Sequence, residues 1–365
     1  MYNMHTHVFT LNHIPDDYMP GFNISWFKNS EFTNCVSWFL SNLNPFSDKD
    51  MLDHAEAWLN NGNKETQLEV FRELINFYPD DTKFVLLPMD FRGTGCNDYS
   101  KEKFKEQLIG LSNIKDIYPD RAIPFTFLNP NNPNLLQDLK FSIEELGFHG
   151  AKIYPKLGYF PNDERLIPCY EYLEDKNIPI ISHGSKGGIF SWNPPSLEQV
   201  KNYYQGKIPS SFKWWWKSDI TKCKYCNDPR NFIPVLDKFP SLKICLAHLG
   251  GDFNSFLKGK SKIKGKVSDN WTAILLNLMD TYENLYTDTA FTFGGDLMGQ
   301  ELIKTSIFHT KKQDRLLLGS DWYMNCIGNG MLNDRNYVKE SLSKYFKKYQ
   351  IELMTEINPK KFLGV

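Results

Sequence analysis

"MYNMHTHVF" (residues 1–9) places two histidines, His5 and His7, one residue apart in a short, largely apolar run. In a β-strand, residues i and i+2 point to the same face, so both imidazoles would project side by side. Two such rings can bind one metal ion, or they can share an ordinary polar surface. The motif alone leaves both interpretations open.

Short apolar runs bounded by turn residues recur along the chain, with helical patterns between them. After residues 1–9 they are KFVLLPMDF (83–91), AIPFTFLNP (122–130), GAKIYP (150–155), IPIISHG (178–184), LKICLAHLGG (242–251), LYTDTAF (285–291) and RLLLGSDWY (315–323). Strands that alternate with helices run parallel, and near-continuous apolar runs suit strands buried on both faces. The eight runs predict an α/β fold, a (β/α)₈ TIM barrel. An open doubly wound sheet is the alternative, but no GxGxxG motif follows the first run.

The composition fits one large domain spanning residues 1–365. Hydrophobic residues make up 41% and charged residues 23%, which allows a sizeable core. The net charge of −1 gives no electrostatic footprint for nucleic acid or an anionic membrane. The sequence shows no leader pattern and no run approaching ~18 apolar residues, so we expect a cytoplasmic protein.

The seven cysteines are odd in number and mostly scattered, as expected for reduced thiols. Only CKYC (223–226) has the spacing of a metal-ligand pair. A structural zinc site would need a second pair, and the sequence has none. We therefore predict two ordinary thiols there.

Polar residues with ligand or acid–base chemistry stand near the C-terminal ends of five runs. They are His5, His7, Lys152, His183, His248 and Asp321. In a barrel those ends converge on one mouth, where catalytic groups gather. Each residue alone could be a buried histidine bonded to the backbone, or an aspartate that caps a helix. Together they predict a site, whereas the remaining histidines fall outside the runs and are expected at surface or loop positions.

The motifs MHTHVF, GAKIYP, IISHG, CLAHLGG and LLLGSDW, with the closing INPKKFLG, resemble the amidohydrolase superfamily. The similarity is greatest to the amidohydrolase-2 group, which includes aminocarboxymuconate-semialdehyde decarboxylase-like enzymes, and it covers residues 1–365. It implies one divalent metal, usually zinc, held by His5, His7, His183 and Asp321. Neutral imidazole and carboxylate oxygen suit Zn²⁺, which lowers the pKa of a bound water towards ~7.

The resemblance also implies two catalytic residues. Asp321 would accept the water's proton while it touches the metal, and His248 would act as general acid or base. The usual pattern has an aspartate two residues before the first histidine, and here that position holds Asn3. Because this is not a ligand position, the ligand set is unaffected.

Lys152 leaves two forms of the site open. In binuclear members of the superfamily a lysine at this place is carboxylated and bridges two metals. In the amidohydrolase-2 group it more often meets a substrate anion as a point charge. We expect a mononuclear site with uncarboxylated Lys152, and a binuclear site remains the alternative.

Two long segments follow the first and fifth runs, at residues 8–50 and 184–229, and both are rich in aromatic residues. Three consecutive tryptophans stand at 214–216. Segments of this length serve as lids or carry short helices. They are expected either to cover a flat or apolar substrate or to form a dimer interface. Arg92 and Lys156 are further candidates for binding a substrate carboxylate.

The leading functional hypothesis is a hydrolase, in which metal-bound hydroxide attacks an ester, lactone or amide carbonyl of a small carboxylate-bearing or aromatic substrate. The alternative uses the same site for non-oxidative decarboxylation of an aromatic or unsaturated acid, with His248 delivering a proton to carbon. A binding protein with a degenerate site is a third possibility. The expected partners are a small-molecule substrate and a second copy of the chain, with no nucleic acid and no membrane.

Overall fold

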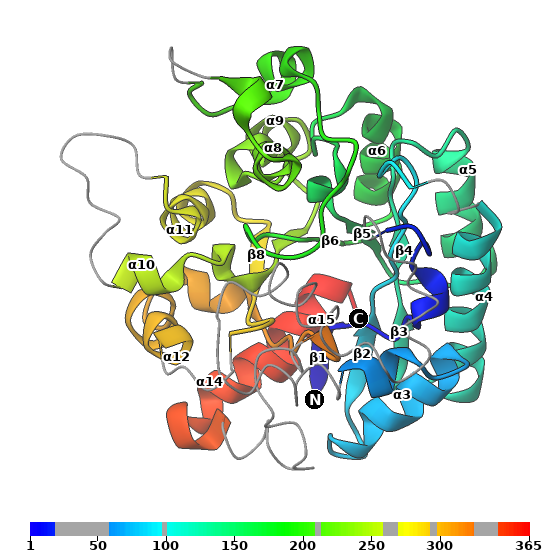
Figure 1. The fold of residues 1–365 in the computed structure, drawn as a ribbon. Helices are drawn as coiled ribbons and strands as arrows, with labels where there is room; N and C mark the ends of the chain where they lie inside the picture. The colour runs from blue at the N-terminus through cyan, green and yellow to red at the C-terminus, as the bar shows by residue number, and fades with distance from the viewer. Residues whose placement is uncertain (19–57, 97–100, 209–212, 258–268, 293–297, 325–341) are drawn as a thin grey trace.

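A set of short parallel strands lies at the centre of the molecule, surrounded by helices (Figure 1). The structure is a computed structural model that describes residues 1–18, 58–96, 101–208, 213–257, 269–292, 298–324 and 342–365. Among the residues in these ranges, no helix is both long and apolar enough to cross a membrane.

The strands coincide with the eight apolar runs of the sequence. Their bounds are β1 Tyr2–Thr6, β2 Lys83–Leu86, β3 Ala122–Pro124, β4 Thr126–Phe127, β5 Ala151–Ile153, β6 Ile180–Ser182, β7 Ile244–Leu246, β8 Leu285–Asp288 and β9 Leu316–Leu317. One parallel sheet has the order β1-β2-β3, and a second runs from β4 to β9. Strands β3 and β4 are two halves of one run, separated only by Phe125, whose N–H donates to Leu86 O at 3.0 Å.

The first and last strands of the series are also joined. Met4 N donates to Leu318 O at 2.7 Å, and Asp321 N donates to His5 O at 2.9 Å. A parallel bridge pairs Thr6 with Trp322. These contacts complete the ring, so the predicted (β/α)₈ barrel is confirmed and the open doubly wound sheet is not.

Helices follow most strands. Their bounds are α3 Gln67–Asn76, α4 Lys101–Ile117, α5 Leu135–Lys140, α6 Ile167–Asp175, α7 Leu197–Tyr203, α8 Asp219–Cys226, α9 Ile233–Lys238, α10 Phe253–Leu257, α11 Trp271–Thr281, α12 Met298–Leu302, α14 Lys348–Glu352 and α15 Asn358–Leu363. Helix α3 illustrates how the sequence determines where a helix begins and which face it buries. Thr66 and Glu69 form a capping box at its start, and Val70 and Leu74 are buried on one face.

The hydrophobic core has two main parts. The larger part lies between strands and helices. The other, called here the interior cluster, contains Tyr2, Met4, Val85, Leu87, Phe125, Ile181, Cys245, Tyr286, Leu317, Phe362 and Leu363. It fills the inside of the barrel and is closed at one end by two side chains of α15.

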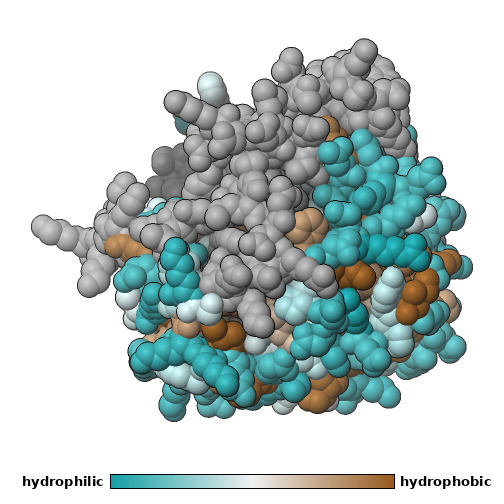
Figure 2. Space-filling model, turned by 90° about the horizontal axis from the view of Figure 1, so that it is seen from below, coloured by the Kyte–Doolittle hydropathy of each residue, from teal (hydrophilic) through white to brown (hydrophobic). Residues whose placement is uncertain are grey.

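The segment after β6 carries α7 and α8, so the prediction of short helices within residues 184–229 holds. Cys223 and Cys226 of α8 are buried free thiols, as predicted. Most of the segment after β1, residues 19–50, lies outside the described residues. The coloured surface in Figure 2 is mainly hydrophilic, with apolar residues scattered over it rather than gathered into one patch.

Candidate active site

The position of His5 depends on an irregularity in β1. Tyr2 and Met4 belong to the interior cluster, and strict alternation would turn His5 away from it. The register between β1 and β2 shifts between Asn3 and Thr6. Such an irregularity re-aims a side chain. His5 therefore also faces the barrel interior, where it contacts Lys152 and Asp288.

The Nδ1 atom of each β1 histidine lies within hydrogen-bond distance of an oxygen acceptor. His5 Nδ1 lies 2.7 Å from Asp288 Oδ2, and His7 Nδ1 lies 2.9 Å from Leu87 O. Because a carboxylate and a carbonyl only accept, both Nδ1 atoms must donate, which leaves each Nε2 with a free lone pair. This is the arrangement that carboxylate or carbonyl partners impose on metal-binding histidines.

Asp321 completes a group of three possible ligands. Its Oδ1 lies 3.4 Å from His7 Nε2 and 3.8 Å from His5 Nε2. The three ligand atoms lie within 4.8 Å of one another, and all three residues are buried. Two imidazole lone pairs and a carboxylate oxygen suit a divalent transition metal, so this donor set fits one.

The charge states also fit a metal. Burial, followed by the charge of Lys152, holds the pKa of His5 well below its usual value. Burial would raise the pKa of Asp321, but the neighbouring His7, His5 and His248 hold it below its usual value. The imidazole of His5 is therefore neutral and the carboxylate of Asp321 ionised at neutral pH, which are the forms that bind metals.

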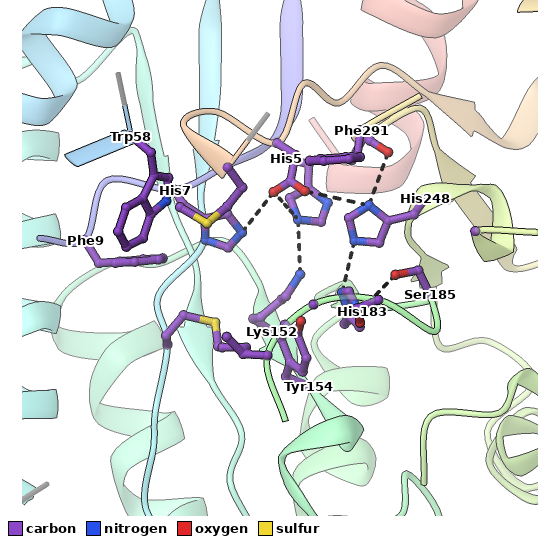
Figure 3. Close-up of a pocket in the computed structure, with 18 of the residues that line it drawn as sticks. His5, His7, Phe9, Trp58, Lys152, Tyr154, His183, Ser185, His248 and Phe291 are labelled. Atoms are coloured by element: carbon purple, nitrogen blue, oxygen red, sulfur yellow. Dashed lines mark hydrogen bonds and ion pairs between the residues drawn. The ribbon is translucent and has the colours of Figure 1, made fainter. Parts of the chain in front are cut away.

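His183 and His248 form a second pair beside this group (Figure 3). His183 Nδ1 lies 3.0 Å from His248 Nε2, and His248 Nδ1 lies 3.8 Å from Asp321 Oδ2. Tyr154 stacks on the His183 ring at a centroid distance of 4.0 Å. The structure thus gathers all four histidines predicted from the sequence, but His183 touches His248 and is not part of the three-residue group.

Three residues around this site have a left-handed backbone. The φ angles of His248, Phe291 and Asp321 are 65°, 62° and 64°. All three line the same pocket. A non-glycine residue in this region costs about 1–2 kcal/mol, and such strain gathers at functional sites. The residues with a left-handed backbone and the candidate metal-binding side chains therefore lie around the same pocket.

The pocket above these groups is largely apolar. It is a concave space, partly open to solvent, of the kind that binds small organic molecules. Its apolar walls include Phe9, Ile14, Trp58, Met89, Phe91 and Phe253. Lys152 is the only lysine or arginine among the described lining residues, and its Nζ lies 3.3 Å from His5 Nε2. Burial lowers the pKa of Lys152 to about 8, although Asp288 and Asp321 oppose this.

The other two predicted cations lie elsewhere. The guanidinium of Arg92 forms a two-pronged ion pair with buried Asp90, at 2.5 and 2.9 Å. The ammonium of Lys156 donates to backbone carbonyls. Neither residue lines the pocket. The structure thus does not place Arg92 or Lys156 among the described residues that line this pocket, and each has local partners.

The segment after β6 supplies part of the wall, but not through its tryptophans. Gly187, Gly188 and Ile189 line the pocket. Trp214 is buried away from it, whereas Trp215 and Trp216 are 72% and 78% exposed. A covering role for this segment therefore involves its first residues rather than the tryptophan run.

Asp288 is a residue that the sequence reasoning missed. It is fully buried, and its Oδ1 accepts from His248 N at 2.8 Å and from Ala290 N at 3.1 Å. Its Oδ2 binds His5. One carboxylate thus positions both a possible metal ligand and the backbone of His248. It lies within the seventh run and is the last residue of β8, so the rule that selected Lys152 and His183 could have found it.

A (β/α)₈ barrel with buried histidines and aspartates at the C-terminal ends of its strands defines a class of metal-dependent barrel enzymes. The family model described as amidohydrolase matches residues 112–326, more than half of the chain. The protein belongs to the amidohydrolase family, and the resemblance seen in its motifs is confirmed. No curated protein matches the sequence.

Solved structures share the fold at low sequence identity. One is a 5-carboxyvanillate decarboxylase from Novosphingobium aromaticivorans with bound manganese and a nitrobenzoic acid, at TM-score 0.60 and 14% identity, covering 100% of this chain and 97% of that chain. A dihydroxybenzoic acid decarboxylase from Polaromonas with bound manganese has TM-score 0.51 and 14% identity, covering 100% and 96%. The 2,6-dihydroxybenzoate decarboxylase from Rhizobium has TM-score 0.53 and 12% identity, covering 100% and 98%.

Proposed function

We propose that this protein is a metal-dependent, non-oxidative decarboxylase of an aromatic or unsaturated carboxylic acid. The observation that carries the proposal is the pocket, in which apolar walls enclose the group of His5, His7 and Asp321. A carboxylate moved from water into such surroundings loses solvation, which favours its conversion to neutral CO₂.

This conclusion replaces hydrolysis, our leading hypothesis from the sequence, with its alternative. A hydrolase must hold the substrate carbonyl and a water molecule beside the metal, whereas most of the pocket surface is apolar and suits a ring or an unsaturated chain. The activities of the structurally similar proteins, which act on hydroxylated benzoates, support the same choice.

The proposed metal ligands are His5, His7, His183 and Asp321, with one metal per chain. A divalent ion there would act as a Lewis acid on substrate oxygens. Zinc is our expectation from the donor set, and the manganese in similar structures makes Mn²⁺ the competing ion. Elemental analysis of purified protein distinguishes the two.

Two residues have proposed roles towards the substrate. Lys152 binds the carboxylate as a point charge at the base of the pocket. His248 holds a proton next to Asp321 and gives it to the ring or vinyl carbon. The bond between that carbon and the carboxyl carbon breaks, its electron pair stays on the substrate carbon, CO₂ leaves and a C–H bond forms.

The test is a panel of hydroxybenzoates and unsaturated acids incubated with the metal-loaded enzyme in D₂O. We expect CO₂ release with one deuterium on the carbon that lost the carboxylate. Metal-stripped enzyme and the His248→Asn variant are the controls. Acid release from esters, lactones or amides without CO₂ from any acid would contradict the proposal and favour a hydrolase.

The homodimer and the covering role of residues 8–50 and 184–229 remain proposals. Sedimentation of the purified protein tests the first. Deletion of residues 208–220 tests whether the tryptophan run takes part in the second: loss of a cover would raise KM, whereas loss of an interface would dissociate the dimer, and unchanged kinetics would confine any cover by this segment to its first residues, such as Gly187 to Ile189.

A further inference from the structure

Lys156 is a buried cation whose partners are all backbone carbonyls. It lies in the short turn Pro155–Leu157 after β5, and its side chain is 1% exposed. Its Nζ donates to the carbonyl oxygens of Lys186 at 2.9 Å, Gly187 at 2.8 Å and Gly188 at 2.7 Å. An ammonium has three N–H donors, so these three consecutive carbonyls satisfy it completely.

This arrangement is costly, because a buried charge without a counter-ion loses its hydration. Among the described residues, no carboxylate forms an ion pair with Lys156. Burial lowers the pKa of Lys156 to about 7, with Lys224 adding to the shift and Cys223 opposing it. A buried ammonium without a counter-ion is retained where its hydrogen bonds have a structural or functional role.

The carbonyls that Lys156 binds belong to a loop that packs on His183. Gly187 O, besides accepting from Lys156, lies 3.0 Å from His183 Nε2. Gly188 has φ +81°, and a Cβ there would lie 2.1 Å from Tyr154 Oη and 3.0 Å from His183 Cε1. With Tyr154 stacked on its face, His183 sits in a slot of which this loop forms one side.

We propose that Lys156 is a positioning residue for the active site. Its ammonium holds the carbonyls of residues 186–188, and this loop in turn sets the His183 ring and the adjoining pocket wall. The inference rests on the proposed function only where it concerns turnover and His183 as a ligand.

The experiment compares Lys156→Met with a matched control, Lys243→Met. Lys243 also donates to backbone carbonyls, Lys361 O at 3.0 Å and Phe362 O at 3.1 Å, but it lies just before β7 at the opposite end of the barrel. Three quantities are measured on each full-length variant: amide hydrogen exchange, affinity for Zn²⁺ or Mn²⁺, and kcat and KM once a substrate is known. Lys156→Gln, which keeps two donors, serves as a conservative variant.

For Lys156→Met we expect exchange at residues 186–190 to rise about tenfold, as fits the net loss of one or two hydrogen bonds. Metal affinity should fall ~10-fold or more, as when a partner that orients a ligand is lost. In Lys156→Gln both changes should be smaller. In Lys243→Met residues 186–190 and the metal affinity should be unchanged.

If Lys156→Met behaves like Lys243→Met in exchange and metal affinity, the proposal is wrong. If both Lys156 variants fail to fold while Lys243→Met folds, Lys156 supports the whole barrel, and a local positioning role is overturned. Exchange and metal affinity need no substrate. A protein that releases no CO₂ but shows both changes would therefore refute the proposed decarboxylase and leave this inference standing.

Discussion

The two ends of the barrel interior are built from the same strands but have opposite chemistry. In β6, Ile181 of the interior cluster is followed two residues later by His183 of the pocket, and in β8 Tyr286 is followed in the same way by Asp288. Two residues along a strand return to the same face. The side chains of the lower end are apolar and closed off by α15, whereas those of the upper end are histidines and carboxylates.

The difference teaches where stability and chemistry lie. Val85 and Leu317 at the lower end have purely apolar side chains that need no polar partner, and they contribute through burial. Each ionisable group at the upper end is buried with a specific partner, such as Asp288 with His5. Changes at the upper end should therefore alter function with modest effects on folding, and changes at the lower end should do the reverse.

The largest effect is expected for His7→Ala. It removes an imidazole from the three-residue group, so metal should be lost and turnover should be abolished, while the barrel remains folded. Elemental analysis and circular dichroism measure these outcomes together. Metal content and activity that match the native protein would remove His7 from the site.

The next largest effect is expected for His248→Asn. If His248 transfers a proton and does not bind the metal, turnover should fall by ~10²–10⁴-fold while metal stays at one ion per chain. The comparison of kcat with metal content checks this. Two ions in the native protein and one in the variant would instead indicate a binuclear site, with Lys152 carboxylated.

A smaller effect is expected for Asp288→Asn. The amide oxygen can still accept from His248 N, but the amide NH₂ would face His5 Nδ1. His5 Nδ1 would then have to accept, which places the proton on Nε2 and removes its lone pair from the metal. We expect metal affinity to fall ~10–100-fold. An unchanged dissociation constant in a chelator competition would show that Asp288 does not orient His5.

The smallest effect on turnover is expected for Phe362→Ala, at the lower end. Phe362 is fully buried in the interior cluster, so its loss should reduce the free energy of unfolding by ~3–5 kcal/mol. The kcat of the folded variant and its metal content should match those of the native protein. Denaturant unfolding and kinetics measure stability and turnover separately. A variant that kept its stability but lost metal would show that the lower end serves the site rather than the stability of the barrel.

The fold was predictable because each strand is a separate apolar run with turn residues at its ends. Most of the upper end was predictable for the same reason, since His183, His248 and Asp321 follow such runs directly. The register shift in β1 could not be predicted, because strict alternation assigns His5 to the face opposite Met4. Only the pairing with β2 reveals the shift.

The hydrogen-bond partners of Arg92 and Lys156 also could not be predicted from the sequence. Arg92 is bound by Asp90 two residues earlier, in a turn that a spacing rule does not identify as a pair. Lys156 binds carbonyls about 30 residues further along the chain. Periodicity shows which positions are apolar, but it carries no information on which distant acceptor a charged group will reach.

The contacts between β1 and the segment after β9 have a consequence for the order of folding. At this seam, Asn3 Nδ2 donates to Ser320 Oγ across 317 residues of sequence, a non-local contact of the kind whose loop-closure entropy must be overcome before the contact forms. His5 and His7 lie on one side of the seam and Asp321 on the other, so their metal site forms only when the ring is shut. An ion bound there at 100 times its Kd would stabilise the shut ring by about 2.7 kcal/mol. A bound ion would therefore oppose opening of the barrel at this seam.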